Sequence, residues 1–124
     1  MLLVKDPLSD ATVNHFAGPE IVDIGVTCLG DRAVMTVTGE LDVSNTAWLY
    51  ECLHDAIDAG ISEIVLDIEH LTYMDSTGLS VLVVANRRMQ SAGGTLTVLS
   101  PTPTVQRLFD AAHVVPSLSV VAAA

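Results

Sequence analysis

The 124 residues are half hydrophobic but only 4% aromatic, so we expect a single domain with an aliphatic core. The formal net charge of −10 makes binding to nucleic acid or to a membrane improbable, because carboxylates repel phosphate backbones and anionic lipid headgroups. Two cysteines are too few for a secreted disulfide framework, and the opening residues lack the basic region of a signal peptide, so we expect a soluble cytoplasmic protein.

The N-terminal part predicts an arm followed by a β-hairpin. Residues 1–20 mix proline, glycine and short polar side chains without periodicity, so we expect a flexible arm ahead of a domain that spans residues 21–124. Apolar residues alternate with small or polar ones from Val22 to Cys28, which is typical of a half-buried strand. A second strand is predicted at Ala33–Thr38. The link between the two strands is so short that we expect an antiparallel pair.

The middle of the chain predicts a helix and a buried strand. Ser44 and Asn45 offer helix caps, and Gly60 stands where helices commonly end. Between them, apolar residues recur at the spacing of one helix face: Leu49, Cys52, Leu53, Ala56 and Ile57. The dense apolar centre of Ile61–Ile68 is typical of an interior strand in a parallel sheet.

The C-terminal part predicts two more helices and a further strand. Leu79–Gln90 is ambiguous by pattern, but its length and the Ala-Gly-Gly stop after it favour a helix packed deep in the fold. A strand is predicted at Leu96–Leu99, and Thr102 precedes a helix with proline at its first position. Leu118–Val121 could add a last strand. The order ββαβαβα predicts an α/β fold in which a mixed sheet has helices packed against it.

The most informative segment is MDSTGLSVL, which runs from Met74 to Leu82. It follows the buried strand after a short connector and continues into the predicted helix. Asp75, Ser76 and Thr77 should therefore lie at a helix N-terminus, where backbone N–H groups are unpaired and the dipole is positive. Hydroxyls at such a place are either simple helix caps or phosphate acceptors, since this end of a helix stabilises a dianion.

Three segments, in this order and at domain spacing, resemble a STAS domain, the family of the bacterial anti-sigma factor antagonists. Residues 36–49, TVTGELDVSNTAWL, resemble the family's strand, G-E-L-D loop and first helix. Residues 63–79, EIVLDIEHLTYMDSTGL, resemble its strand and D-S-S/T-G phosphorylation loop. Residues 92–112, AGGTLTVLSPTPTVQRLFDAA, resemble its next strand and the helix of pattern S/T-P-x-V-x-R-L-F. The resemblance implies a STAS-like fold for most of the chain.

The resemblance also implies a phosphorylation site and a partner. The phosphate acceptor would be Ser76, the first hydroxyl residue after the aspartate, with Thr77 as the second choice. The partner would be an anti-sigma factor with serine/threonine kinase activity, which the unphosphorylated protein binds so that a sigma factor is released. That kinase would phosphorylate Ser76, and a phosphatase would restore the hydroxyl. The protein would then be a substrate and not an enzyme, and no cofactor is implied.

The loop after the second strand should lie beside Ser76 on the partner-facing surface, by the same resemblance. Its carboxylates, Glu40 and Asp42, suit contact with basic residues of a partner, although an ordinary strand-to-helix loop explains them equally well. Gly78 either lets the backbone turn tightly into the helix or is small for packing. The expected partner-binding surface consists of Glu40, Asp42, Ser44, Asp75, Ser76, Thr77 and Gly78.

Other reactive side chains suggest no further site. Cys28 and Cys52 lie on apolar faces, so we expect buried, inert thiols rather than a redox pair. The four histidines lack metal-ligand spacing, so we expect them to be solvated and no metal to bind. Two alternatives to the phosphorylation switch remain. One is a scaffold or ligand-sensing STAS module, and the other is a hydrolase that uses Ser76, for which His70 is the nearest base in the sequence.

Overall fold

The computed structural model describes residues 12–17, 22–113 and 118–122, which form one mixed β-sheet and three helices. The elements in chain order are β1 (Thr12–Ala17), β2 (Val22–Leu29), β3 (Arg32–Leu41), α1 (Thr46–Asp58), β4 (Glu63–Asp67), β5 (Leu71–Met74), α2 (Ser76–Ser91), β6 (Thr95–Leu99), α3 (Pro103–Ala111) and β7 (Ser119–Val121). Each helix and strand predicted from the sequence is present, with ends that differ by a few residues.

The sheet combines an antiparallel and a parallel half, as the sequence predicts. Its strand order is β1-β2-β3-β4-β6-β7, and β5 pairs with β3 off this path. The pairs β1–β2 and β2–β3 are antiparallel, whereas β3–β4, β4–β6 and β6–β7 are parallel. The dense apolar run of β4 is therefore explained, because this strand has a parallel neighbour on each side.

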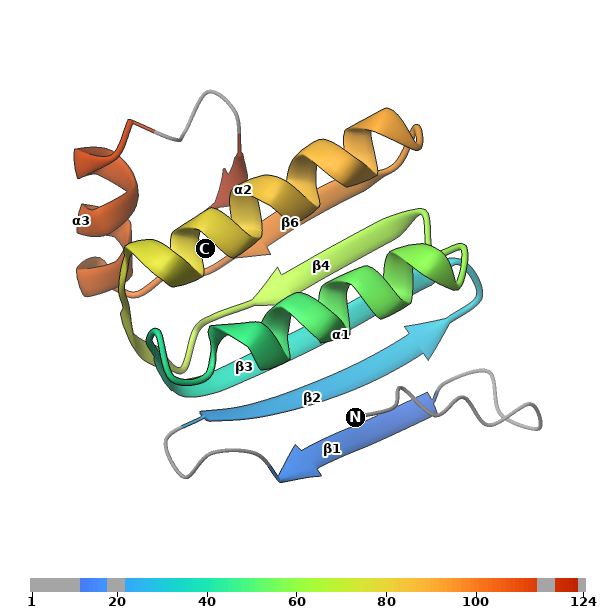
Figure 1. Ribbon diagram of the computed structural model, residues 1–124, viewed down its shortest axis with the longest axis horizontal. Helices are drawn as coiled ribbons and strands as arrows, with labels where there is room; N and C mark the ends of the chain where they lie inside the picture. The colour runs from blue at the N-terminus through green and yellow to red at the C-terminus, as the bar shows by residue number, and fades with distance from the viewer. Residues whose placement is uncertain (1–11, 18–21, 114–117, 123–124) are drawn as a thin grey trace.

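The helices α1 and α2 lie next to each other over one face of the sheet, and α3 lies at one end of it, near β5 (Figure 1). Alternate residues of the strands point into this interface and are buried, as in the pattern of β2 and β3. The core between sheet and helices is aliphatic. The side chains that the two helices bury there include Leu49, Leu53, Leu82 and Met89.

Two strands were not predicted. The expectation of a flexible arm over residues 1–20 is wrong for Thr12–Ala17. These residues form β1, and each of them pairs with a residue of β2. Residues 1–11 and 18–20 lie outside the described part of the chain. The short connector expected before Met74 is also wrong, because Leu71–Met74 forms β5. Neither strand shows the alternation of apolar and polar residues that made β2 recognisable in the sequence. In β5, only Leu71 and Met74 are buried.

Candidate functional site

The candidate site lies where β3 and β5 end together. These strands are parallel, with Glu40 opposite Tyr73 and Leu41 opposite Met74. The N–H of Asp75 extends the pairing, because it donates to the carbonyl oxygen of Leu41 at 3.2 Å. The loop that leads from β3 into α1 therefore lies beside the N-terminus of α2 (Figure 1). The adjacency that the sequence resemblance implied is thus present.

Asp75 caps α2 and joins it to the neighbouring loop. Its Oδ1 accepts hydrogen bonds from the N–H groups of Thr77 at 2.9 Å and Gly78 at 3.2 Å, and from the hydroxyl of Thr77. The backbone N–H of Val43, in the loop after β3, lies near enough to this carboxylate to favour its charged form. The hydroxyl of Thr77 is the main cause of a lowered pKa of Asp75; burial opposes this shift, and the backbone N–H groups of Gly78, Thr77 and Val43 add to it. The carboxylate is therefore held in its charged form.

The two candidate hydroxyls differ in their surroundings. Ser76, the first residue of α2, is exposed. Thr77 is half-buried, and its hydroxyl is hydrogen-bonded to Asp75. The backbone carbonyl of Ser76 accepts a hydrogen bond from the hydroxyl of Ser80, one turn later in the helix. Of the two hydroxyl groups, that of Ser76 is thus the more accessible to another protein.

A set of local hydrogen bonds orders the loop between β3 and α1. Asp42 Oδ1 accepts from both the N–H and the hydroxyl of Ser44, at 2.9 and 2.5 Å. Asn45 Oδ1 accepts from the N–H of Asp42, and its Nδ2 donates to the carbonyl of Glu40, each at 2.9 Å. Asn45 stands at the N-cap position of α1 as predicted, but its side chain does not cap the helix. The side chain instead holds the preceding loop in place. The sequence alone does not predict this role, because it depends on how the chain folds around Asn45.

The expected surface residues are brought together, but they are not equally accessible. Glu40, Ser44 and Ser76 are exposed, and Asp42, Asp75 and Thr77 are half-buried. Gly78 is buried inside α2 and has an ordinary backbone conformation. A Cβ at this position would lie 2.9 Å from Cδ2 of Leu41 and 2.9 Å from Cγ of Met74. The packing interpretation of Gly78 is therefore confirmed, and it offers no surface to a partner.

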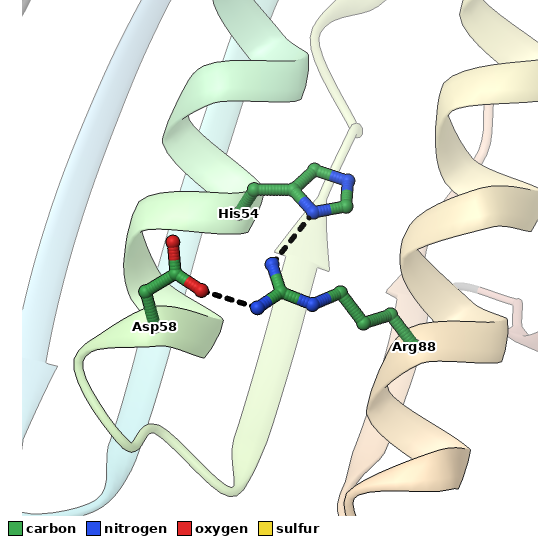
Figure 2. A network of polar contacts seen from close by, with 3 residues as sticks. All are labelled: His54, Asp58 and Arg88. Carbon is green, nitrogen blue, oxygen red and sulfur yellow. Dashed lines mark hydrogen bonds and ion pairs between the residues drawn. The ribbon is translucent and has the colours of Figure 1, made fainter.

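A second polar cluster joins α1 to α2 away from this site (Figure 2). Arg88 of α2 forms an ion pair with Asp58, and its Nη1 lies 2.9 Å from Nδ1 of His54. The ring of Tyr50 stacks on that of His54, with 3.9 Å between the ring centroids. The expectation that the histidines are solvated is wrong for His54, which is half-buried and in contact with Arg88 and Tyr50. The reason is that positions 54 and 88 meet across the helix contact, which sequence spacing does not reveal.

The remaining predicted groups are placed as follows. Cys28 and Cys52 are buried thiols, as expected, and burial together with Asp55 and Glu51 raises the pKa of Cys52 to about 12. His70 is exposed ahead of β5. No group of three or more His, Cys, Asp or Glu side chains in the described part of the chain could hold a metal ion. Over the same residues, no helix combines the length and apolar character needed to cross a bilayer.

Comparison with known proteins points to one family. The model of the STAS domain matches residues 23–123. The anti-sigma-B factor antagonist of Staphylococcus aureus is 34% identical over 74 residues, which cover 60% of this chain and 68% of that protein. An anti-sigma factor antagonist from Mycobacterium paratuberculosis has a similar fold, with a TM-score of 0.74 at 17% identity over 85% of this chain and 89% of that one.

A third similar protein has been solved in two covalent states. The anti-sigma factor antagonist SpoIIAA of Bacillus, in its unphosphorylated form, gives a TM-score of 0.65 at 21% identity over 90% of this chain and 87% of that one. Its phosphorylated form gives a TM-score of 0.60. At such low identities, these structures establish the fold that the chains share.

Proposed function

The chain belongs to the STAS domain family, and we propose that it is an anti-sigma factor antagonist switched by phosphorylation of Ser76. In this proposal the unphosphorylated protein binds an anti-sigma factor, so that a sigma factor is released. The name of the Staphylococcus aureus relative supports the role. The observation that carries the switch is the exposed hydroxyl of Ser76 at the first turn of α2, beside an ordered acidic loop.

Ser76 is the better acceptor because its neighbour's hydroxyl is already engaged. The hydroxyl of Thr77 donates a hydrogen bond to Asp75, so phosphoryl transfer to this hydroxyl would remove its proton and break a bond that helps to cap α2. Ser76 is exposed, and a kinase can reach it without disturbing the cap. Structures of Bacillus SpoIIAA are known for both its unphosphorylated and its phosphorylated form, which supports the idea that a protein of this fold tolerates phosphorylation.

A phosphate on Ser76 should leave the fold intact and weaken the complex. The helix N-terminus favours a dianion, so the phosphate is tolerated locally. At an interface, however, the bulk and about −1.5 to −2 charges of the phosphate arrive at the edge of the contact, beside Asp42 and Asp75, where they repel the acids that the partner presents to the first turn of α2. One new like-charge contact at ~4 Å costs up to about 4 kcal/mol at an effective dielectric constant near 20. That corresponds to a loss of affinity on the order of several hundredfold.

The partner in this proposal is an anti-sigma factor with serine/threonine kinase activity. Its kinase would phosphorylate Ser76 in the complex and so cause its own release, and a phosphatase would reset the switch. The protein acts as a substrate and binding module rather than as an enzyme, in the cytoplasm where sigma factors work. The surface that meets the partner would include Glu40, Asp42 and Ser44 together with the first turn of α2.

The test combines phosphorylation with binding. The protein is incubated with ATP and each purified anti-sigma factor of the source organism, and the modified residue is mapped by mass spectrometry. Calorimetry then compares wild type, phosphorylated protein, Ser76→Ala and Ser76→Asp. We expect Ser76→Ala to bind without being modified, and Ser76→Asp to fold but bind poorly. Equal affinities for all four forms would refute the switch and favour a scaffold or ligand-sensing module.

A further inference from the structure

Val43 has the most exposed large hydrophobic side chain in the described part of the chain. Its exposed fraction is 75%, compared with 54% for Leu29, the next in order. It stands in the middle of the loop between β3 and α1, next to Asp42 and Ser44. A single exposed aliphatic side chain is ordinary on a protein surface. The position of Val43 is informative because of how firmly its backbone is held.

Local hydrogen bonds hold the loop on both sides of Val43. The backbone of Val43 also lies near the carboxylate of Asp75, which caps the neighbouring helix. On one side, Asp42 Oδ1 accepts from the N–H and the hydroxyl of Ser44. On the other, the side chain of Asn45, only 2% exposed, bonds to the backbone of Asp42 and Glu40. An apolar group held in an ordered loop loses little conformational entropy when a partner covers it, so it is well suited to act as a binding anchor.

Asp75 makes Val43 and Ser76 parts of the same surface. Its N–H donates to the carbonyl oxygen of Leu41, two residues before Val43, its carboxylate lies near the Val43 backbone, and the next residue in the chain is Ser76, at the first position of α2. Glu40, near the end of β3, and Asp42, the first residue of the loop, add carboxylates to this surface. A partner that covers Val43 therefore meets an apolar side chain next to the carboxylate of Asp42, with the phosphorylation site close by.

We infer that Val43 is the apolar anchor by which the Ser76 surface binds its protein partner. The partner is a protein whose docking face has an apolar pocket for Val43, bordered by lysine or arginine side chains that complement Glu40 and Asp42. The inference rests on the proposed function, which names the anti-sigma factor as that partner. It adds that affinity comes from Val43 and that the phosphate on Ser76 acts at the edge of the same contact.

The test compares Val43→Ser and Val43→Leu with the matched control Leu29→Ser. Leu29 is also exposed, but it pairs with Arg32 at the start of β3, whereas Val43 follows the end of β3 at Leu41. Each full-length variant is titrated by calorimetry against the purified anti-sigma factors of the source organism, and its melting temperature is recorded. We expect Val43→Ser to lose about tenfold in affinity. Val43→Leu and Leu29→Ser should bind within about threefold of wild type, and all three should melt close to wild type.

The outcomes separate this inference from the proposed function. If wild type binds an anti-sigma factor and Val43→Ser binds equally well, the anchor role is wrong while the switch survives. An equal loss in Val43→Leu and Val43→Ser would contradict an apolar pocket, and an equal loss in Leu29→Ser would remove any special role of this loop. If wild type binds none of the anti-sigma factors, the proposed function fails and this inference fails with it.

Discussion

Arg88 reaches from α2 to α1 and places its Nη1 2.9 Å from Nδ1 of His54. A guanidinium group only donates hydrogen bonds, so Nδ1 must accept, and the proton of the neutral imidazole must lie on Nε2. That Nε2 atom is buried and has no hydrogen-bond partner among the described residues. A second proton on this ring would have to replace the bond from Arg88 and would place two cations side by side. The helix contact is therefore built for the neutral form of His54 (Figure 2).

Stability should consequently decrease as the solution becomes mildly acidic. Burial, followed by the charge of Arg88, lowers the pKa of His54, while Asp58 and Asp55 oppose the shift. The unfolded chain takes up this proton near pH 6.5, and the folded chain only at lower pH. The contribution of neutral His54 is complete above pH 6.5 and is lost as the pH falls from there toward the folded pKa. Urea denaturation at pH 7.5 and pH 5.5 measures the difference.

The variant His54→Gln isolates this effect, because glutamine does not titrate. We expect the fall in stability between pH 7.5 and pH 5.5 to be smaller in His54→Gln than in wild type. The matched control is His70→Gln, since His70 is exposed and should contribute little to the difference. If His54→Gln and wild type lose the same stability over this interval, the neutral histidine is not the cause.

The capping of α2 gives a second prediction, which separates Asp75 from Thr77. Asp75→Ala removes the acceptor of two helix N–H groups, so we expect a loss of about 1–2 kcal/mol in the free energy of unfolding. Thr77→Ala removes only the hydroxyl donor, and a loss of about 0.5–1 kcal/mol is expected. Urea denaturation of both variants at pH 7 checks the order. A larger loss for Thr77→Ala would show that the carboxylate is not the main cap.

Much of this site follows from the sequence because it is local. Asp75 and Ser76 are adjacent in the chain, and the apolar spacing after them already predicts the helix that they begin. The long-range contacts were less accessible to prediction. Asn45 bonds to the backbone of Glu40, and His54 meets Arg88, only because the sheet and the helix pair bring those segments together. No period in the sequence indicates either contact.

The same distinction explains the two strands that were missed. β2 and β4 carry enough β-branched or alternating apolar residues to be recognised in isolation. β5 has only four residues and is defined by its pairing with the end of β3. β1 is likewise defined by its six pairs with β2, in a stretch that also contains polar residues. For such segments the neighbouring strand supplies the structure, and local preference is a weak guide.

Removal of the N-terminal segment tests the importance of β1. Deletion of residues 1–17 would leave β2 as the edge strand, with its outward backbone groups unpaired. We expect the melting temperature to fall by several degrees, as a loss of about 1–2 kcal/mol would give in a domain of this size. The matched control deletes only residues 1–11, which precede β1. Equal melting temperatures for wild type and both truncated chains would show that β1 contributes nothing to stability.

Gly78 provides the last prediction, in which two opposing effects are compared. Alanine has a higher helix propensity than glycine, by up to about 1 kcal/mol. The added Cβ, however, would lie 2.9 Å from Cδ2 of Leu41 and 2.9 Å from Cγ of Met74, and both side chains are buried. Overpacking of this kind costs about 1–3 kcal/mol, so Gly78→Ala should be destabilising by about 1 kcal/mol net. Urea denaturation of Gly78→Ala measures this loss, with Ser80→Ala, an exposed position on the same helix, as a control that should be nearly neutral.

The double variant Gly78→Ala, Leu41→Val identifies the cause, because a shorter side chain at position 41 makes room for the new methyl group. Its loss of stability should be smaller than the sum of the two single losses. Strict additivity would show that the contact with Leu41 is not what requires glycine at this position.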